Sequence, residues 1–309
     1  MDTITLIKKL EKPMLTSAST VDMILDTDAY NEIDDQFAIA YMLANRNKLN
    51  VKAIYAAPFH NGKSSDPKDG MEKSYDEIKK VLSMIENTDG IEVYKGSQKY
   101  LKDEKTPEIS PASEHLANIA EQYSPSNPLY VTAIGAITNI ASAILINPKI
   151  IDNIVVIWLG GNALDWHDTK EFNLYQDVAA ARIIFGCGVP LVQMPCMGVV
   201  SAFTISEAEL KHWLLGKNKI SDYLARNTID EASSYANGKP WTRVIWDVTG
   251  VAWLVDNGRF FQERLERSPI PEYDGHYAHD CRRHFIKYIY HVNRDALVED
   301  LFEKLINLK

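Results

Sequence analysis

Short apolar runs alternate with helical patterns along the first two-thirds of the chain, and this alternation restricts the fold more than any other feature. Apolar residues recur at helical spacing in the segments that begin at Tyr75, Glu114, Ile137 and Ala179. Strands that alternate with helices form a mostly parallel central sheet covered on both faces, so we predict an α/β fold with a Rossmann-like core. The predicted strands are Met23–Leu25, Val51–Ala57, Ile91–Tyr94, Leu129–Ala133, Ile154–Leu159 and Leu191–Met194.

The chain after about Ser201 has a mostly helical pattern, and no stretch has the composition of a domain linker. Polar segments at Lys63–Asp69, Asp103–Pro111 and Ser268–His279 are predicted to be loops. We therefore expect one domain over residues 1–309, with residues 1–20 as an N-terminal extension and the second half packed around the sheet.

Charge and composition narrow the class of protein. A formal net charge of -9 and the lack of a basic stripe argue against a nucleic-acid partner and favour a small-molecule ligand. No apolar run is long enough to span a membrane, and the first residues do not resemble a signal peptide, so we expect a cytoplasmic protein. The three cysteines, Cys187, Cys196 and Cys281, have no metal-ligand spacing and are predicted to be buried free thiols.

Several carboxylates follow the first predicted strand, in the segment MILDTDAYNEIDDQFAIAYML. The strand runs into Asp26 and Asp28, and a helix begins near Ile33 with Asp34 and Asp35 beside its start. Ligands bind at this edge of an open α/β sheet, so Asp28, Asp34 and Asp35 are predicted to converge on one crevice. A hard divalent cation such as Ca²⁺ would neutralise them. Each acid alone has an ordinary explanation as a helix-terminal or loop-capping residue, and only the whole cluster favours a metal.

The same segment resembles the acidic N-terminal motif of the inosine/uridine-type nucleoside hydrolases. Three further blocks occur in the family's order, namely YVTAIGAITNIASAIL, LGGN followed by EFNLYQDVAAARIIF, and IWDVTGVAWLV. Four ordered blocks make the resemblance specific. It implies a calcium-dependent enzyme of nucleoside catabolism that hydrolyses the N-glycosidic bond of ribonucleosides to free base and ribose, and that assembles as a homodimer or homotetramer.

The resemblance also assigns roles around the cation. Asp28 would be a metal ligand and the base that deprotonates the attacking water, and Asp35 would be the main chelating carboxylate. Ile134 would contribute its backbone carbonyl, and Asp247 would complete the protein ligands. Asp34 would bind the ribose 2′-hydroxyl.

Other residues that match the family's motifs would bind the sugar. Asn61 and Asn173 would contact ribose hydroxyls and Glu171 the 5′-hydroxyl, although Asn61 also has an ordinary explanation as a turn residue. The segment ALDWHDTK lacks the asparagine that commonly assists at the 5′-hydroxyl, and Trp166, His167 and Asp165 are all candidates to replace it. The spacer AYNEI is longer than in well-known members and lacks their Pro-Gly.

Trp246 stands directly before Asp247, where one branch of the family has a histidine that protonates the leaving base. The Trp-Asp pair instead resembles the purine-preferring branch, in which aromatic stacking activates the base, so Trp246 is a candidate substrate-binding residue. Trp246 is equally well explained as a core residue, because a second tryptophan, Trp253, follows it at helical spacing. Two alternative functions are a haloacid-dehalogenase-type phosphohydrolase, because Asp-x-Asp also ends a strand there, and a non-catalytic nucleoside or ribose binder with the same fold.

Overall fold

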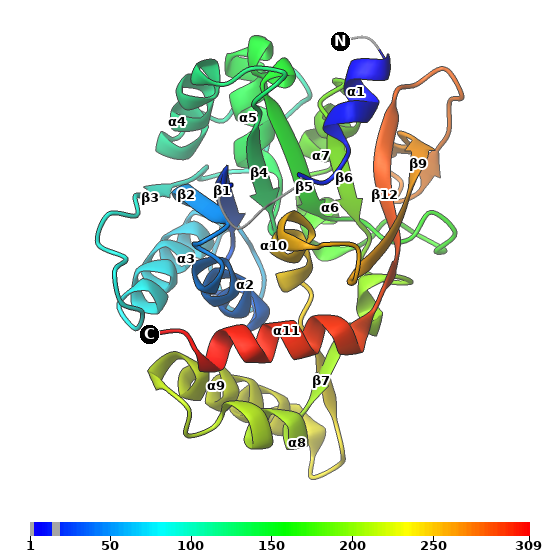
Figure 1. The fold of residues 1–309 in the computed structure, drawn as a ribbon. Coiled ribbons are helices and arrows are strands. Elements are labelled where there is room, and N and C mark those ends of the chain that lie inside the picture. The colour runs from blue at the N-terminus through cyan, green and yellow to red at the C-terminus, as the bar shows by residue number, and fades with distance from the viewer. Residues whose placement is uncertain (1–2, 14–18) are drawn as a thin grey trace.

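An eight-stranded sheet forms the centre of the computed structural model, which describes residues 3–13 and 19–309 (Figure 1). The strand order is β3-β2-β1-β4-β5-β6-β12-β9. Every neighbouring pair is parallel except β12 and β9, which confirms the predicted mostly parallel α/β fold. The strands are β1 Val21–Thr27, β2 Leu49–Ala56, β3 Val93–Lys95, β4 Leu129–Ala133, β5 Ile154–Leu159, β6 Leu191–Met194, β9 Phe261–Arg267 and β12 Phe285–Val292.

Helices cover both faces of the sheet, and each face has its own buried apolar cluster. Strands β4 and β5 are buried along their whole length, as expected for central parallel strands. One face is covered by α2 Asp34–Ala44, α3 Pro67–Leu82, α10 Val248–Val255 and α11 Arg294–Ile306. The other is covered by α4 Pro111–Ile119, α5 Thr138–Ile146 and α7 Val178–Gly186.

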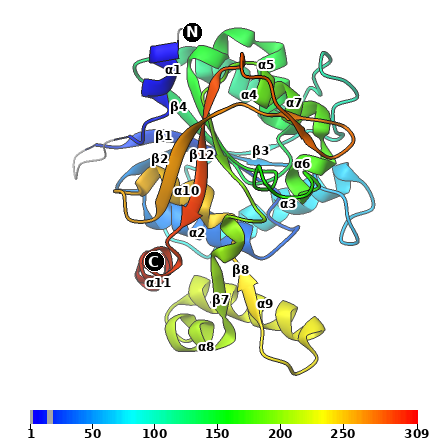
Figure 2. The ribbon, with the colours of Figure 1, turned by 90° about the vertical axis from the view of Figure 1, so that its right-hand side faces the viewer.

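A smaller group of elements lies beyond α11, away from the sheet (Figures 1 and 2). It contains a short antiparallel pair, β7 and β8, and the long helix α9. Its elements are β7 Thr204–Ser206, α8 Glu207–Glu209, η4 Leu210–Leu214, α9 Lys219–Ala236 and β8 Thr242–Val244. The remaining short elements are α1 Thr3–Lys9, η1 Ala120–Gln122, η2 Pro148–Asp152, α6 Phe172–Gln176, η3 Val200–Ala202, β10 Ile270–Pro271 and β11 Tyr277–Ala278.

Strands β9 and β12 complete the sheet, although the sequence of this part of the chain was expected to be mostly helical. More residues of this part of the chain lie in helices than in strands, as expected. The expectation did not include strands β9 and β12. The aromatic and β-branched sequence of β12, FIKYIYHV, is typical of a strand, whereas the charged β9, FQERLER, occupies the sheet edge. The predicted loop Ser268–His279 contains the β10–β11 hairpin.

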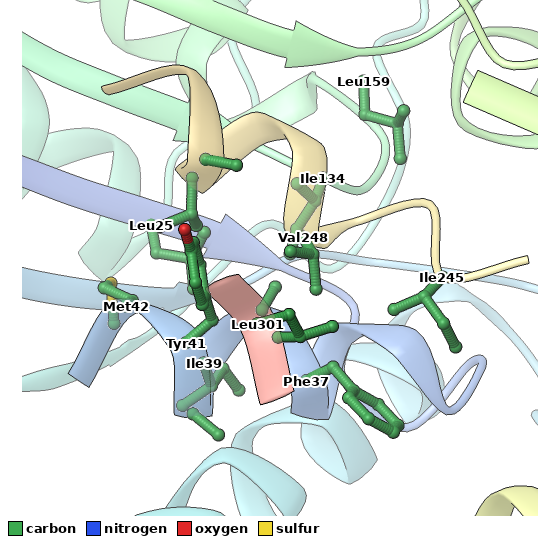
Figure 3. Packing of buried hydrophobic residues seen from close by; sticks show 14 of the residues in the cluster. Leu25, Phe37, Ile39, Tyr41, Met42, Ile134, Leu159, Ile245, Val248 and Leu301 are labelled. Carbon is green, nitrogen blue, oxygen red and sulfur yellow. The ribbon is translucent and has the colours of Figure 1, made fainter. Parts of the chain in front are cut away.

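Helix α10 packs very close to the sheet because its residue 250 is glycine. A Cβ at Gly250 would lie 2.9 Å from Cγ2 of Thr132 and 3.2 Å from Cγ2 of Ile134. Val248 at the start of α10 belongs to the same buried cluster as Ile134 and Phe37 (Figure 3). This close approach brings the first residues of α10 to the ends of the central strands.

Candidate active site

Four aspartates meet where the central strands end. Asp28 follows β1, Asp34 and Asp35 open α2, and Asp247 directly precedes α10. All four are buried, with exposed fractions of 1 to 4%. They line one cavity of about 470 Å³ at the carboxyl ends of the strands, which is the edge where the sequence predicted a ligand site.

Three of these carboxylates are close enough to share one cation. Asp34, Asp35 and Asp247 each offer an oxygen within 4.8 Å of the other two. The sequence-based assignment had placed Asp28 rather than Asp34 among the ligands. Within the described ranges, Asp28 does not belong to this group of three carboxylates, although it lines the same cavity. The Thr27 hydroxyl donates a hydrogen bond to Asp35 and holds that carboxylate in place.

Burial and mutual repulsion perturb all four acids. Burial raises the pKa of Asp35 to about 7 even though the Thr27 hydroxyl opposes the shift. Burial, with the negative charges of Asp35 and Glu32, holds the pKa of Asp28 well above its ordinary value. Burial and the negative charges of neighbouring carboxylates also raise the pKa values of Asp34 and Asp247. Arg243 opposes the shift at Asp34. Four crowded buried acids are costly unless they bind protons or a cation.

The donor set fits a hard divalent cation. Oδ2 of Asp28 and Oδ1 of Asp34 are buried without a hydrogen-bond partner among residues 3–13 and 19–309. Buried carboxylate oxygens normally have partners, so these two are the atoms that a ligand is expected to satisfy. Oxygen-only coordination by carboxylates and backbone carbonyls is typical of Ca²⁺.

Asn173 connects two of the strand ends that border the cavity. Its Nδ2 donates to the carbonyl oxygen of Ile134 at 3.1 Å and to that of Leu159 at 3.0 Å. Ile134 itself lines the cavity, as the family resemblance requires of a carbonyl that faces the cation. Asn173 is buried and lines the cavity as well.

Glu171 also lines the cavity, where its carboxylate caps the short helix α6. The side chain accepts hydrogen bonds from the backbone N–H groups of Asn173, Leu174 and Gly161. Burial raises the pKa of Glu171, and these backbone donors oppose the shift. The carboxylate therefore fixes the local backbone in addition to facing the cavity.

Asn61 lies one contact away from the cavity. Its Nδ2 donates to Oδ1 of Asn31 at 2.6 Å, and Asn31 is the residue that lines the cavity. Trp246 lines the cavity and is half-buried, and it also packs against the main apolar cluster. Both explanations offered for Trp246 from the sequence therefore describe part of its surroundings.

Several residues that line the cavity had no predicted role, including Asn31, Glu32, Asn162 and Cys196. Asn31 and Glu32 lie in the spacer AYNEI. Their position between Asp28 and Asp34 is the sequence feature that could have indicated a place in the cavity. Asn162 completes the GGN block, and its amide binds Met197 N and Asp168 O. Cys196 is buried as expected, whereas Cys281 is exposed and the expectation of a buried thiol there is wrong.

Solved structures of nucleoside hydrolases share this fold. A plant nucleoside hydrolase, PpNRh1, matches with a TM-score of 0.74 at 20% identity over 93% of this chain and 99% of that chain. A purine-preferring ribonucleoside hydrolase from Gardnerella vaginalis matches with a TM-score of 0.75 at 18% identity, over 92% of this chain and 98% of that chain. The fold is therefore that of the nucleoside hydrolases.

The family model described as inosine-uridine preferring nucleoside hydrolase matches residues 23–297, and the chain belongs to this family. It is thus an N-glycosyl hydrolase that acts on ribonucleosides, in a family that uses a metal bound by an aspartate cluster. A curated relative, the pyrimidine-specific ribonucleoside hydrolase RihA of Salmonella paratyphi A, is 26% identical over 75% of this chain and 79% of its own length. Because the chain belongs to this family, the alternative of a haloacid-dehalogenase-type phosphohydrolase is excluded.

No helix within residues 3–13 and 19–309 has the length and apolarity to span a membrane.

Proposed function

We propose that the protein is a calcium-dependent ribonucleoside hydrolase that prefers purine bases. The observation that carries the proposal is the convergence of four buried aspartates and Trp246 on one cavity. Asp28, Asp35, Asp247 and the Ile134 carbonyl would hold the cation. The closeness of Asp34 to Asp35 and Asp247 supports placing Asp34 at the cation too, where it would also meet the ribose 2′-hydroxyl.

A bound Ca²⁺ would supply charge that holds the vicinal ribose hydroxyls and makes a nearby water more acidic. Asp28 would take the proton of the attacking water, because its Oδ2 is buried and lacks a protein partner among the described residues. The glycosidic bond breaks through an oxocarbenium-like transition state, with positive charge on the ribose and negative charge on the departing base. The buried acids would stabilise the ribose side of that charge.

The ribose would lie between the acids and Asn173. The Nδ2 of Asn173 is held by two backbone carbonyls, which orients its Oδ1 as an acceptor for a sugar hydroxyl. Asn61 would act through Asn31, to which it donates a hydrogen bond. Trp246 would stack on the base and favour its departure.

Release of free base from a panel of nucleosides tests the proposal. Inosine, adenosine, guanosine, uridine and cytidine are incubated with the protein and Ca²⁺ or with a chelator, and base and ribose are quantified. The proposal expects calcium-dependent release with higher kcat/KM for the purines. Faster release of uridine and cytidine would overturn the purine preference, and chelator-resistant release would overturn the calcium assignment. Nucleoside binding by calorimetry without base release would identify a non-catalytic binder.

We also propose that residues 1–309 form one cytoplasmic domain that assembles as a homodimer or homotetramer. The packing of the C-terminal helix α11 against α2, in the first half of the chain, supports a single domain. Light scattering coupled to size-exclusion chromatography measures the assembly, and a monomeric mass at micromolar concentration would contradict it.

A further inference from the structure

Strand β9 leaves one edge of the central sheet open. It is the last strand of the sheet order, and within residues 3–13 and 19–309 it pairs with β12 alone. Figure 1 shows β9 beyond β12 at the right-hand side of the sheet. Alternate residues of an edge strand direct their backbone N–H and C=O groups away from the sheet. This edge therefore offers backbone hydrogen bonds to a further strand.

The side chains of β9 alternate in face, and both faces carry charge. Arg264 and Glu266 share one face, where Nε of Arg264 lies 2.7 Å from Oε1 of Glu266 and both side chains remain partly exposed. Glu263, Leu265 and Arg267 point to the other face because successive residues of a strand alternate. Leu265 is 37% exposed and stands at the middle of this charged sequence.

The charge order of β9 is complementary to an antiparallel copy of itself. In a pair of β9 strands centred on Leu265, Arg264 of each copy lies opposite Glu266 of the other, and the two Leu265 side chains meet. Opposite charges across antiparallel strands stabilise the pair, and like charges destabilise it. Glu263 and Arg267 form a further pair of opposite charges in this register, although two lysines of the same chain already bind Glu263.

The same charges disfavour the neighbouring registers. A pair of strands centred on Arg264 would bring two arginines together, and a pair centred on Glu266 would bring two glutamates together. Charges on an edge strand commonly prevent pairing altogether. On β9 their order instead permits one antiparallel register.

Aromatic side chains of β12 lie beside the arginine of this edge. The Arg264 guanidinium is 5.3 Å from the ring centroid of Tyr288 and 5.6 Å from that of Tyr290. Tyr290 is 43% exposed. A glutamate from a second copy would therefore meet Arg264 next to an aromatic surface, where partial exclusion of water strengthens an ion pair.

We propose that β9 pairs antiparallel with β9 of a second copy of this chain, about a two-fold axis at Leu265, so that two sheets become continuous. The same surface of each copy forms such an interface, as two-fold symmetry requires. The inference rests on the assembly proposed above and does not depend on hydrolysis. The acidic cavity is lined by residues outside β9, so substitutions in β9 are expected to leave kcat unchanged.

Charge reversal tests the interface in the full-length protein. Arg264→Glu places a glutamate opposite Glu266, and Glu266→Arg places an arginine opposite Arg264. In a dilution series measured by light scattering, each single variant should fall to half the wild-type mass at a concentration at least about tenfold higher. The double variant Arg264→Glu/Glu266→Arg should regain wild-type association. Arg226→Glu, at an exposed arginine of α9, is the matched control and keeps it.

A mixture of the two single variants separates lost complementarity from lost folding. A chain with Arg264→Glu carries two acids at positions 264 and 266, and a chain with Glu266→Arg carries two arginines there. The mixed pair is again complementary in the register centred on Leu265. Native mass spectrometry should show assemblies that contain one chain of each kind, and their absence would overturn the proposal.

A disulfide at the two-fold axis tests the register. Cys281→Ser first removes an exposed thiol. In this background, Leu265→Cys places two thiols directly opposite each other, at a separation that a disulfide can bridge. Mild oxidation should then give a covalent dimer. The two copies of Gln262→Cys would lie roughly 20 Å apart in the same register and should stay unlinked.

The outcomes separate the interface from the assembly itself. A monomeric wild-type protein would overturn both. A wild-type oligomer whose mass changes in neither Arg264→Glu nor Glu266→Arg would overturn the β9 interface alone. Cross-linking of Gln262→Cys in place of Leu265→Cys would overturn the register centred on Leu265.

Discussion

Gly135, which follows β4, lies directly against the carboxylate of Asp28. A Cβ at Gly135 would be 2.9 Å from Oδ1 of Asp28 and 3.1 Å from the Cβ of Ala57. The carbonyl of Gly135 accepts a hydrogen bond from the Trp158 indole at 3.1 Å, which fixes this turn on the neighbouring strand. The position of the proposed catalytic base therefore depends on the absence of a side chain at residue 135.

Gly135→Ala should consequently impair hydrolysis more than it impairs folding. The added methyl would push the Asp28 carboxylate aside, and misplacement of a catalytic group by about 1 Å costs on the order of a hundredfold in rate. Overpacking is expected to cost about 1–3 kcal/mol of stability. Steady-state kinetics and thermal unfolding measure the two effects. Gly90→Ala is the matched control, because a Cβ there meets nothing within 4 Å, and equal activity of both variants would contradict the argument.

The central strands could be predicted from the sequence because they are buried on both faces. Leu129–Ala133, Ile154–Leu159 and Leu191–Met194 were predicted with the bounds that the structure has. Such strands are continuous apolar runs, which is a strong local signal. The edge strand β9 has no such run. Its conformation is determined by pairing with β12 at the sheet edge. The sequence of one segment does not reveal a tertiary contact of this kind.

The acidic cavity could be predicted because its ligands follow strands and start helices, which parallel topology brings together. Asp28, Asp35 and Asp247 were placed in one crevice on that ground and on the family motifs, and all three line the cavity. The indirect position of Asn61 and the hydrogen bond from Met197 N–H to Asn162 could not be predicted. Both depend on how loops distant in sequence pack against each other.

Asp28→Asn is expected to remove hydrolysis while the protein stays folded. The amide keeps the shape of the carboxylate but cannot accept the proton of the attacking water, so kcat should fall by roughly a hundredfold or more. Removing one of several repelling buried acids also predicts an unchanged or higher melting temperature. Asp89→Asn, at an exposed aspartate, is the matched control. Undiminished turnover by Asp28→Asn would remove the general-base assignment.

Metal-free protein should become less stable as the pH rises from about 4 to 7. Burial raises the pKa of Asp35 to about 7 and likewise that of Asp26 to about 7, above the ordinary value of 3.8. In this window the folded state binds more protons than the unfolded state, so the free energy of unfolding falls as pH increases. Thermal unfolding in chelator should therefore give a higher melting temperature at pH 5.5 than at pH 7.5.

Calcium should change that pH dependence. The ion binds the ionised carboxylates, so its stabilisation is expected to be larger at pH 7.5 than at pH 5.5. At a hundredfold excess over Kd the gain is about 2.7 kcal/mol. Melting curves with Ca²⁺ and with chelator at both pH values measure it. An equal increase in melting temperature at both pH values would indicate that the ion binds elsewhere than at the buried aspartates.

Trp246 should affect substrates according to how much activation their leaving group needs. If its ring stacks on the base, Trp246→Ala lowers kcat/KM for inosine by about tenfold, since an aromatic contact contributes roughly 0.5–1.5 kcal/mol beyond burial. Nitrophenyl riboside has a leaving group that departs without such help and should lose much less. Trp246→Phe keeps an aromatic face and is expected to restore most of the activity on inosine. Equal losses on both substrates, together with a lower melting temperature, would instead assign Trp246 to the apolar cluster against which it packs.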